Sequence, residues 1–383
     1  MDFDLSEEQQ LLKDSVEGFL SDTYDFESRK KIAALPGGWS PEVWAKFAEL
    51  GLLGLPFAED DGGFGGGAVE TMLLAESFGK HLVLEPYLAT VILGGGVVKR
   101  AGSAAQKAEH IAAIAEGART FALATTDRHS RYDMFDVTTT AKKDGASYVL
   151  DGEKAVVVHG GTADRIIVSA RSAGSRRDRG GIGLFIVAAD AEGLIRRSSP
   201  TQDGTHAAEI TLSGVRVDAD GILGDPEGGL PVLEAVADEA IAALCAEAVG
   251  AMSELTDLTV DYLKQRKQFG VPIGGFQALQ HRAAEMFVAL EQARSMAMFA
   301  AMTASTEDAT ERRALASAAK VQIGRSAKFI GQQGIQLHGG IGMTMEYKAG
   351  HYFKRLTMID TLFGDADHHL AQVADYGQLV STA

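Results

Sequence analysis

The fold class is decided by the stretch Tyr148-Val-Leu-Asp151-Gly152-Glu-Lys-Ala155-Val-Val-Val-His159. β-Branched residues lie on both sides of the Asp-Gly pair, and such a pair between two β-favouring runs predicts a hairpin turn. Further strands are expected over 166–170, 182–188 and 209–217, each bounded by turn residues. These short strands predict a small antiparallel β domain that extends to about residue 222.

Helical patterns flank this region on both sides. Before it, apolar residues from Leu11 to Leu20 recur at intervals of three and four, which predicts an amphipathic helix, and Ser6 with Gln9 has the pattern of a capping box. After it, long helices are expected over 233–264, 282–303, 307–334 and 357–376. Blocks segregated in this way favour an α+β multidomain architecture over a parallel doubly wound sheet. The expected parts are an N-terminal α-helical domain (1–118), a middle antiparallel β domain (119–225) and a C-terminal α-helical bundle (226–383).

The composition narrows the classes of partner. The chain has 383 residues with a formal net charge of −16, and an acidic surface repels phosphate backbones and anionic lipid, so neither nucleic acid nor membrane is an expected partner. The acidic start lacks the order of a signal peptide, and no stretch approaches the roughly 18 apolar residues that span a bilayer. The single cysteine, Cys245, excludes an intrachain disulfide. We therefore expect a cytoplasmic protein.

Two motifs in the C-terminal part have both a structural and a functional interpretation. Arg266-Lys-Gln-Phe269-Gly270 follows a long predicted helix. It could be an ordinary helix end with Gly270 as C-cap, or Arg266 could pair with a pyrophosphate while Phe269 covers an aromatic ring. The glycines Gly339 and Gly340 also follow a helix, where backbone without Cβ atoms could approach a phosphate. The residue types alone leave these alternatives open.

Metal ligands and general bases are scarce. Asp365 to His369 contains acidic and imidazole side chains, but neighbouring residues on a helix diverge, so a polar helix start is favoured and no metal site is expected. Asp238, Glu239 and Glu247 lie on an alanine-rich predicted helix. A desolvated carboxylate has a raised pKa that suits proton abstraction, and Glu247 is the best candidate base. The alternative is a solvated surface glutamate.

Taken together, the chain resembles the acyl-CoA dehydrogenase family over nearly its whole length. The resemblance rests on the order and spacing of several motifs: Gly51-Leu-Leu-Gly-Leu-Pro56, Asp151-Gly-Glu-Lys154, Leu212-Ser-Gly-Val-Arg-Val217, Gln265-Arg-Lys-Gln-Phe-Gly-Val-Pro-Ile273 with Gln277, and Gln336-Leu-His-Gly-Gly340. It implies the family's α-domain, β-domain, α-domain fold. It also implies FAD-dependent α,β-desaturation of an acyl-CoA thioester, in which a carboxylate removes the α-proton and the flavin accepts the β-hydride. The electrons would leave through an electron-transfer flavoprotein.

The resemblance also assigns cofactor-binding residues. In this family each FAD lies across two subunits of a tetramer, and two motifs hold the adenosine diphosphate half of the neighbour's cofactor. The matching residues here are Arg266, Gln268, Phe269, Gln277, Gln336, Gly339 and Gly340. Thr126 begins the segment that matches the family's flavin-binding loop in the β domain.

The residues that depart from the family pattern are at the positions expected to contact the flavin ring and to act as the base. Tyr132 replaces a loop serine that steadies the cofactor, and the Trp-Ile-Thr segment that packs the flavin appears as the valine run 156–158. A common site of the catalytic Glu is occupied by Phe363, and the family's alternative base position aligns with Ala240. Neither side chain can abstract a proton.

These departures favour a paired arrangement, as in heteromeric relatives such as pimeloyl-CoA dehydrogenase, whose small subunit this chain resembles. In that hypothesis the chain is part of an α2β2 heterotetramer, and a paralogous large subunit carries the base. One alternative is a homotetrameric dehydrogenase with a displaced base, Glu247 or Glu239. Others are a direct oxidase, or a non-catalytic scaffold or acyl-thioester-binding protein that has lost FAD. The acyl group is not indicated.

Overall fold

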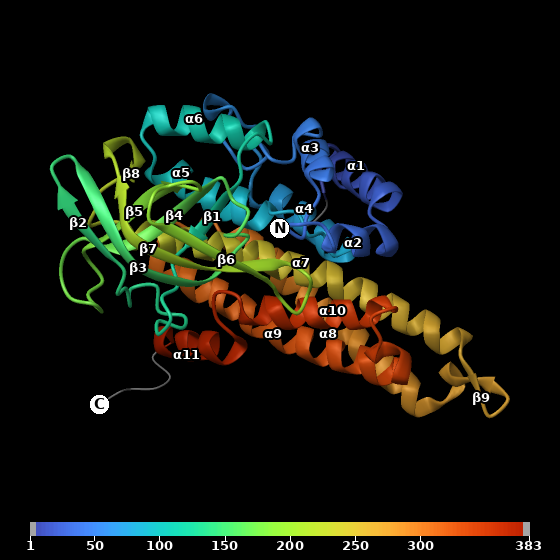
Figure 1. The fold of residues 1–383 in the computed structure, drawn as a ribbon. Coiled ribbons are helices and arrows are strands. Elements are labelled where there is room, and N and C mark those ends of the chain that lie inside the picture. Colours follow the sequence, from blue (N-terminus) through green and yellow to red (C-terminus); the bar gives the residue numbers. More distant parts are fainter. Residues whose placement is uncertain (1–4, 378–383) are drawn as a thin grey trace. The chain divides into compact units, whose positions relative to one another are not determined.

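The computed structural model of the chain describes residues 5–377. They form two compact units (Figure 1). The first combines residues 68–83 with the described parts of 1–30 and 241–383, and the second combines 31–67 with 84–240. No helix among the described residues is long and apolar enough to cross a membrane.

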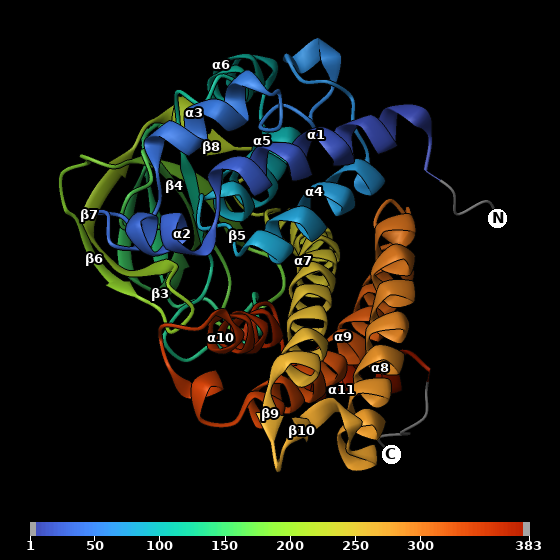
Figure 2. The same ribbon diagram turned by 90° about the vertical axis from the view of Figure 1, so that its right-hand side faces the viewer.

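The first unit is helical. Figure 2 shows α7, α8 and α9 as long rods that run roughly alongside one another, with the β9–β10 hairpin near one end. Its elements are α1 (Glu7–Thr23), α4 (Ala68–His81), most of α7 (Leu230–Gln265), β9 (Lys267–Gln268), β10 (Val271–Pro272), η4 (Ile273–Gly275), α8 (Gln277–Thr303), α9 (Ala309–His338), η5 (Gly339–Met343), α10 (Lys348–Thr361) and α11 (Ala366–Tyr376). The helix α2 (Phe26–Ala33) begins in this unit.

Glycines let α4 and α7 approach closely inside this unit. A Cβ atom at Gly79 would lie 1.8 Å from the carbonyl oxygen of Glu247, and one at Gly250 would lie 1.9 Å from that of Glu76. Any side chain at either glycine would therefore push the two backbones apart. The predicted capping box of α1 is confirmed, because the Ser6 hydroxyl accepts from the Gln9 amide and the Gln9 side chain accepts from the Ser6 amide.

The expected helix over 357–376 is wrong as a single element. The chain leaves the helical conformation after Thr361, and α11 starts only at Ala366. Phe363 and Gly364 lie between them with φ angles of 58° and 118°. These left-handed values are incompatible with a continuous helix.

The second unit is built around an eight-stranded sheet of order β6-β7-β3-β2-β4-β5-β8, with β1 paired to β4. Most pairs are antiparallel, whereas β1 and β2 each pair with β4 in parallel. The strands are β1 (Phe121–Ala124), β2 (Thr140–Asp144), β3 (Ser147–Val158), β4 (Arg165–Arg171), β5 (Ile182–Ala188), β6 (Leu194–Pro200), β7 (His206–Val217) and β8 (Ile222–Leu223). Its helices include α3 (Pro41–Glu49), η1 (Glu59–Asp61), η2 (Leu88–Gly95), α5 (Gly96–Ala101), α6 (Ala104–Ala115) and η3 (Ala219–Gly221). The order of helices, sheet and helices along the chain confirms the predicted fold class.

The predicted hairpin turn at Asp151-Gly152 is wrong. Both residues lie inside β3, where a β-bulge separates Leu150 from Gly152 and pairing with β7 continues on either side. The turn of the β2–β3 hairpin lies instead at Gly145-Ala146, between the paired residues Asp144 and Ser147. Asp151 is used differently, because its carboxylate accepts a hydrogen bond from the Gly214 amide at 2.8 Å.

Candidate cofactor site

A short hairpin follows the end of α7 and carries the first cofactor motif (Figure 1). The Arg266 amide still donates to the Tyr262 carbonyl, and β9 then pairs with β10. Phe269 and Gly270 form the turn with φ angles of 54° and 83°. Positive φ at both central residues is the mark of a type I′ hairpin turn. Of the two alternatives for this motif, the one with Gly270 as helix C-cap is therefore wrong, and Phe269 is 91% exposed at the tip of the hairpin.

The second cofactor motif lies where α9 ends. Gln336 is exposed in the last turn of the helix, and the chain leaves the helix at Gly339 with a φ of 62°. A Cβ atom at Gly339 or at Gly340 would have no other atom within 4 Å. Packing therefore requires a glycine at neither position, but the positive φ of Gly339 favours glycine there, so Gly340 alone of the two has neither reason to be a glycine. Exposed backbone without Cβ atoms suits the close approach of a phosphate-bearing ligand.

Aromatic contacts bring these motifs together within the first unit. The ring of Tyr262, one turn before Arg266, lies 4.7 Å from the ring of His338, which directly precedes Gly339. The Phe269 ring in turn contacts Phe276, immediately before Gln277, at 6.1 Å. The Tyr262–His338 contact thus joins the segment that precedes Arg266 to the segment that precedes Gly339, whereas the Phe269–Phe276 contact lies within the first motif.

The surface formed in this way fits the adenosine diphosphate half of FAD. Within the described part of the chain, no hydrogen bond or ion pair occupies the side chains of Arg266, Gln268, Gln277 or Gln336, and all four residues are exposed. A guanidinium can hold a pyrophosphate, an exposed aromatic ring can cover a base, and amides can bind polar groups of both. This donor set has the chemistry that such a ligand requires.

Thr126 lies in the second unit, in a loop held by a buried ion pair that we did not predict. The Thr126 carbonyl accepts from the Ala155 amide at 2.8 Å, and the neighbouring Asp127 carboxylate accepts from Lys154 Nζ at 2.5 Å. Burial alone would raise the pKa of Asp127, but attraction to Lys154 lowers it, whereas burial lowers the pKa of Lys154. A lysine that is buried within a strand needs a buried acidic partner. The position of Lys154 between the apolar residues of β3 is therefore the signal in the sequence that could have predicted this pair.

The valine run that departs from the family pattern contains a strained residue. Val156 has a φ of 54° at an irregularity of β3, and its side chain is 58% exposed. A β-branched residue rarely adopts this conformation. Tyr132 lies partly buried in the loop after Asp127.

The candidate base Glu247 is held by an arginine. Both of its carboxylate oxygens accept hydrogen bonds from Arg355, at 2.5 and 2.9 Å, and its side chain is 13% exposed. Glu239, in the second unit, pairs with Arg100 at 2.8 Å. Ala240 is fully buried. The pairing of Glu247 favours a structural carboxylate, and its role as a base stays a prediction.

The turn that carries Phe363 is fixed by two buried side chains. Lys320 Nζ donates to the carbonyl oxygens of Asp360 and Gly364 at 2.9 and 2.7 Å, and His369 Nε2 lies 3.1 Å from the Phe363 carbonyl. Burial lowers the pKa of His369 to about 3, so its ring is neutral. Asp365 caps α11. Among the described residues, no group of three His, Cys, Asp or Glu side chains could hold a metal ion.

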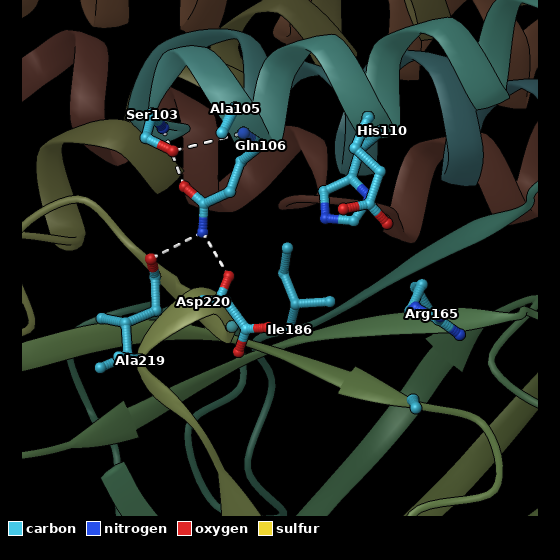
Figure 3. Close-up of a pocket in the computed structure, with 12 residues that line it drawn as sticks. Ser103, Ala105, Gln106, His110, Arg165, Ile186, Ala219 and Asp220 are labelled. Carbon is cyan, nitrogen blue, oxygen red and sulfur yellow. Dashed lines mark hydrogen bonds and ion pairs between the residues drawn. The ribbon is translucent and has the colours of Figure 1, made fainter. Parts of the chain in front are cut away.

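A separate crevice lies in the second unit between α6 and the edge of the sheet (Figure 3). Its volume is about 400 Å³, and none of the predicted site residues lines it. Gln106 spans it to donate to the carbonyl oxygens of Asp220 and Ile222, and His110 Nδ1 accepts from Arg119. Because none of the predicted site residues lines it, the crevice is not part of the candidate site.

Comparison with known proteins places the chain in a family. Family models described as Acyl-CoA dehydrogenase N-terminal, middle and C-terminal domain match residues 6–118, 122–215 and 227–377. The chain is also 32% identical to the probable acyl-CoA dehydrogenase YngJ of Bacillus subtilis (strain 168), over 91% of this chain and 92% of that protein. The chain belongs to the acyl-CoA dehydrogenase family. The family resemblance found in the sequence is thereby confirmed.

Two solved structures have the same fold as this chain. The Tcur3481-Tcur3483 steroid ACAD is 28% identical, covers 98% of this chain and 99% of that chain, and has a TM-score of 0.87. The FAD complex of PigA is 25% identical, covers 99% of this chain and 100% of that chain, and has a TM-score of 0.89. The chain therefore matches both structures over nearly its full length.

Proposed function

We propose that this chain is a subunit of an FAD-dependent acyl-CoA dehydrogenase and contributes the adenosine diphosphate half of the flavin sites. The observation that carries the proposal is the exposed surface formed by the β9–β10 hairpin and the Gly339–Gly340 turn. The side chains of Arg266, Gln268, Gln277 and Gln336 have no partner within the described chain, and neither packing nor a positive φ requires a glycine at Gly340. The FAD complex of PigA supports FAD as the cofactor.

In this proposal the roles of the residues follow from their chemistry. Bound FAD supplies the acceptor for the hydride that leaves the acyl-CoA thioester. Arg266 neutralises the pyrophosphate, and Phe269 covers the adenine ring from the tip of its hairpin. The amides of Gln268, Gln277 and Gln336 bind polar groups, while Gly339 and Gly340 leave room for the backbone to approach the ligand.

The base is assigned to a partner chain. Phe363 and Ala240 occupy the two base positions that the family resemblance implies, and Arg355 holds both oxygens of Glu247. The Tcur3481-Tcur3483 name pairs two proteins in one steroid ACAD, which supports a heteromer. We therefore favour an α2β2 assembly of the pimeloyl-CoA dehydrogenase type, with this chain as its small subunit and an electron-transfer flavoprotein as electron acceptor.

Replacing Arg266 by alanine in the flavin-containing assembly tests the proposal. We expect the Kd for FAD to rise about tenfold or more, because a charged hydrogen bond to the pyrophosphate is lost. The Kd for FMN, which has no adenosine half, should stay within about twofold. Arg216→Ala is the matched control, since Arg216 is exposed on β7 and pairs with Asp144. An unchanged Kd for FAD in the Arg266 variant would contradict the proposal.

A further inference from the structure

We infer that His338 is a positioning residue for the adenosine half of the flavin site, an inference that rests on the proposed function. His338 is the last residue of α9 and directly precedes Gly339. It is 3% exposed, so its ring is inside the protein and does not itself reach a ligand on the surface. Its effect on the cofactor must act through the residues that it holds in place.

Three rings join three chain segments at this point. The ring centroid of His338 lies 4.7 Å from that of Tyr262 and 5.1 Å from that of Tyr347. The two tyrosine centroids are 6.5 Å apart. We call Tyr262, His338 and Tyr347 the aromatic clamp. It fastens the end of α7 to the end of α9 and to the residue that precedes α10.

Both ends of the aromatic clamp connect directly to residues that we propose bind FAD. The carbonyl of Tyr262 accepts the hydrogen bond from the Arg266 amide, so the clamp fixes the base of the hairpin. On the other side, His338 is bonded covalently to Gly339. The contact between the Tyr262 and His338 rings therefore sets the distance between Arg266, at the base of the hairpin, and Gly339.

A hydrogen bond fixes the orientation of the His338 ring. Its Nδ1 lies 2.7 Å from the Gly334 carbonyl oxygen. Because a carbonyl only accepts, Nδ1 carries the proton in this contact. Burial lowers the pKa of His338, so the ring is neutral at physiological pH. A fixed neutral ring holds the last turn of α9, and this turn determines where Gly339 leaves the helix.

The experiment compares FAD with FMN in the flavin-containing assembly. FMN has the same ring system but lacks the adenosine half, so a fault confined to that half changes FAD binding alone. In His338→Leu, which removes the ring and the hydrogen bond, we expect the Kd for FAD to rise roughly tenfold. The Kd for FMN should remain within about twofold. Tyr262→Leu removes the ring from the other side of the clamp and should give the same pattern.

The matched control is Tyr148→Leu, which removes a ring from the Tyr148–Phe185 contact at 5.1 Å in the second unit. It should lower the melting temperature without changing the ratio of the two dissociation constants. Equal effects on FAD and FMN in the clamp variants, or none on FAD, would overturn the inference. If Arg266→Ala weakens FAD and the clamp variants do not, only this inference fails. If Arg266→Ala also has no effect, the proposed function fails.

Discussion

At the residue scale, the surroundings of a carboxylate decide which role it can have. Glu247 has the sequence context of a desolvated base, with alanines on both sides. In the structure its two oxygens accept hydrogen bonds from Arg355, which lies 11% exposed beside it. A guanidinium in this bidentate contact occupies lone pairs of the carboxylate that would otherwise accept a substrate proton. The ion pair thus favours a role in holding α7 to α10.

Glu247→Gln distinguishes the two roles. If the carboxylate is structural, the free energy of unfolding should fall by about 1–3 kcal/mol, because a charge-assisted hydrogen bond is lost. Denaturant unfolding measures this change. Glu254→Gln is the control, since Glu254 lies on the same helix and pairs with Lys348 at 2.5 Å. A loss of turnover of about a hundredfold or more at unchanged stability, seen for Glu247 and not for Glu254, would instead identify a base.

At the scale of elements, an ion pair docks α1 onto α4. Glu17 accepts from Lys80 at 2.7 Å and lies 3.5 Å from His81 Nε2. Burial alone would raise the pKa of Glu17, but hydrogen bonds from His81 and Lys80 outweigh it and lower the pKa from 4.5 to about 2. A depressed carboxyl pKa stabilises the folded state above the unfolded value. This contribution is lost as the pH falls from 4.5 towards 2.

Glu17→Gln should therefore lower the free energy of unfolding by about 1–2 kcal/mol at neutral pH, a value reduced for the partial exposure of the pair. The difference from the unaltered protein should shrink between pH 4.5 and 2, where the native carboxylate takes up its proton. Urea unfolding at a series of pH values measures it. Asp22→Asn, at an exposed carboxyl near the end of the same helix, is the control. A difference independent of pH would refute the assignment to Glu17.

The elements also show what local sequence can and cannot predict. The capping box at Ser6 and the strand over 182–188 were predicted correctly, because capping and β-branched runs act over a few residues. The Asp151-Gly152 turn failed because pairing with β7, distant in sequence, extends β3 through it. The Asp127–Lys154 pair was missed for the same reason, since the two residues meet only when the sheet forms.

At the scale of the whole molecule, the fold class predicted from the sequence is confirmed, whereas the adenosine-binding residues stay a prediction. These residues belong to contiguous motifs, so their order could be read without the structure. The ring contacts that connect Tyr262 with His338 join residues far apart in the chain and became visible only in the fold. What the proposed function adds is a division between chains: the adenosine half lies here, and the flavin and base half lies in a partner.

This division predicts which purified form contains flavin: the chain alone or its complex with a partner. The chain purified alone should show no flavin absorbance, because it offers only an adenosine-binding surface and no cofactor is held by that half alone. Co-expression with a candidate large subunit from the acyl-CoA dehydrogenase family should give an α2β2 complex with flavin absorbance, which native mass spectrometry and the visible spectrum measure together. The Arg266→Ala complex, as control, should assemble with the same subunit stoichiometry and retain less FAD after gel filtration. A lone chain that is yellow and bleaches with an acyl-CoA would contradict the division and make the homotetramer the functional form, with Glu247 as the residue to replace first.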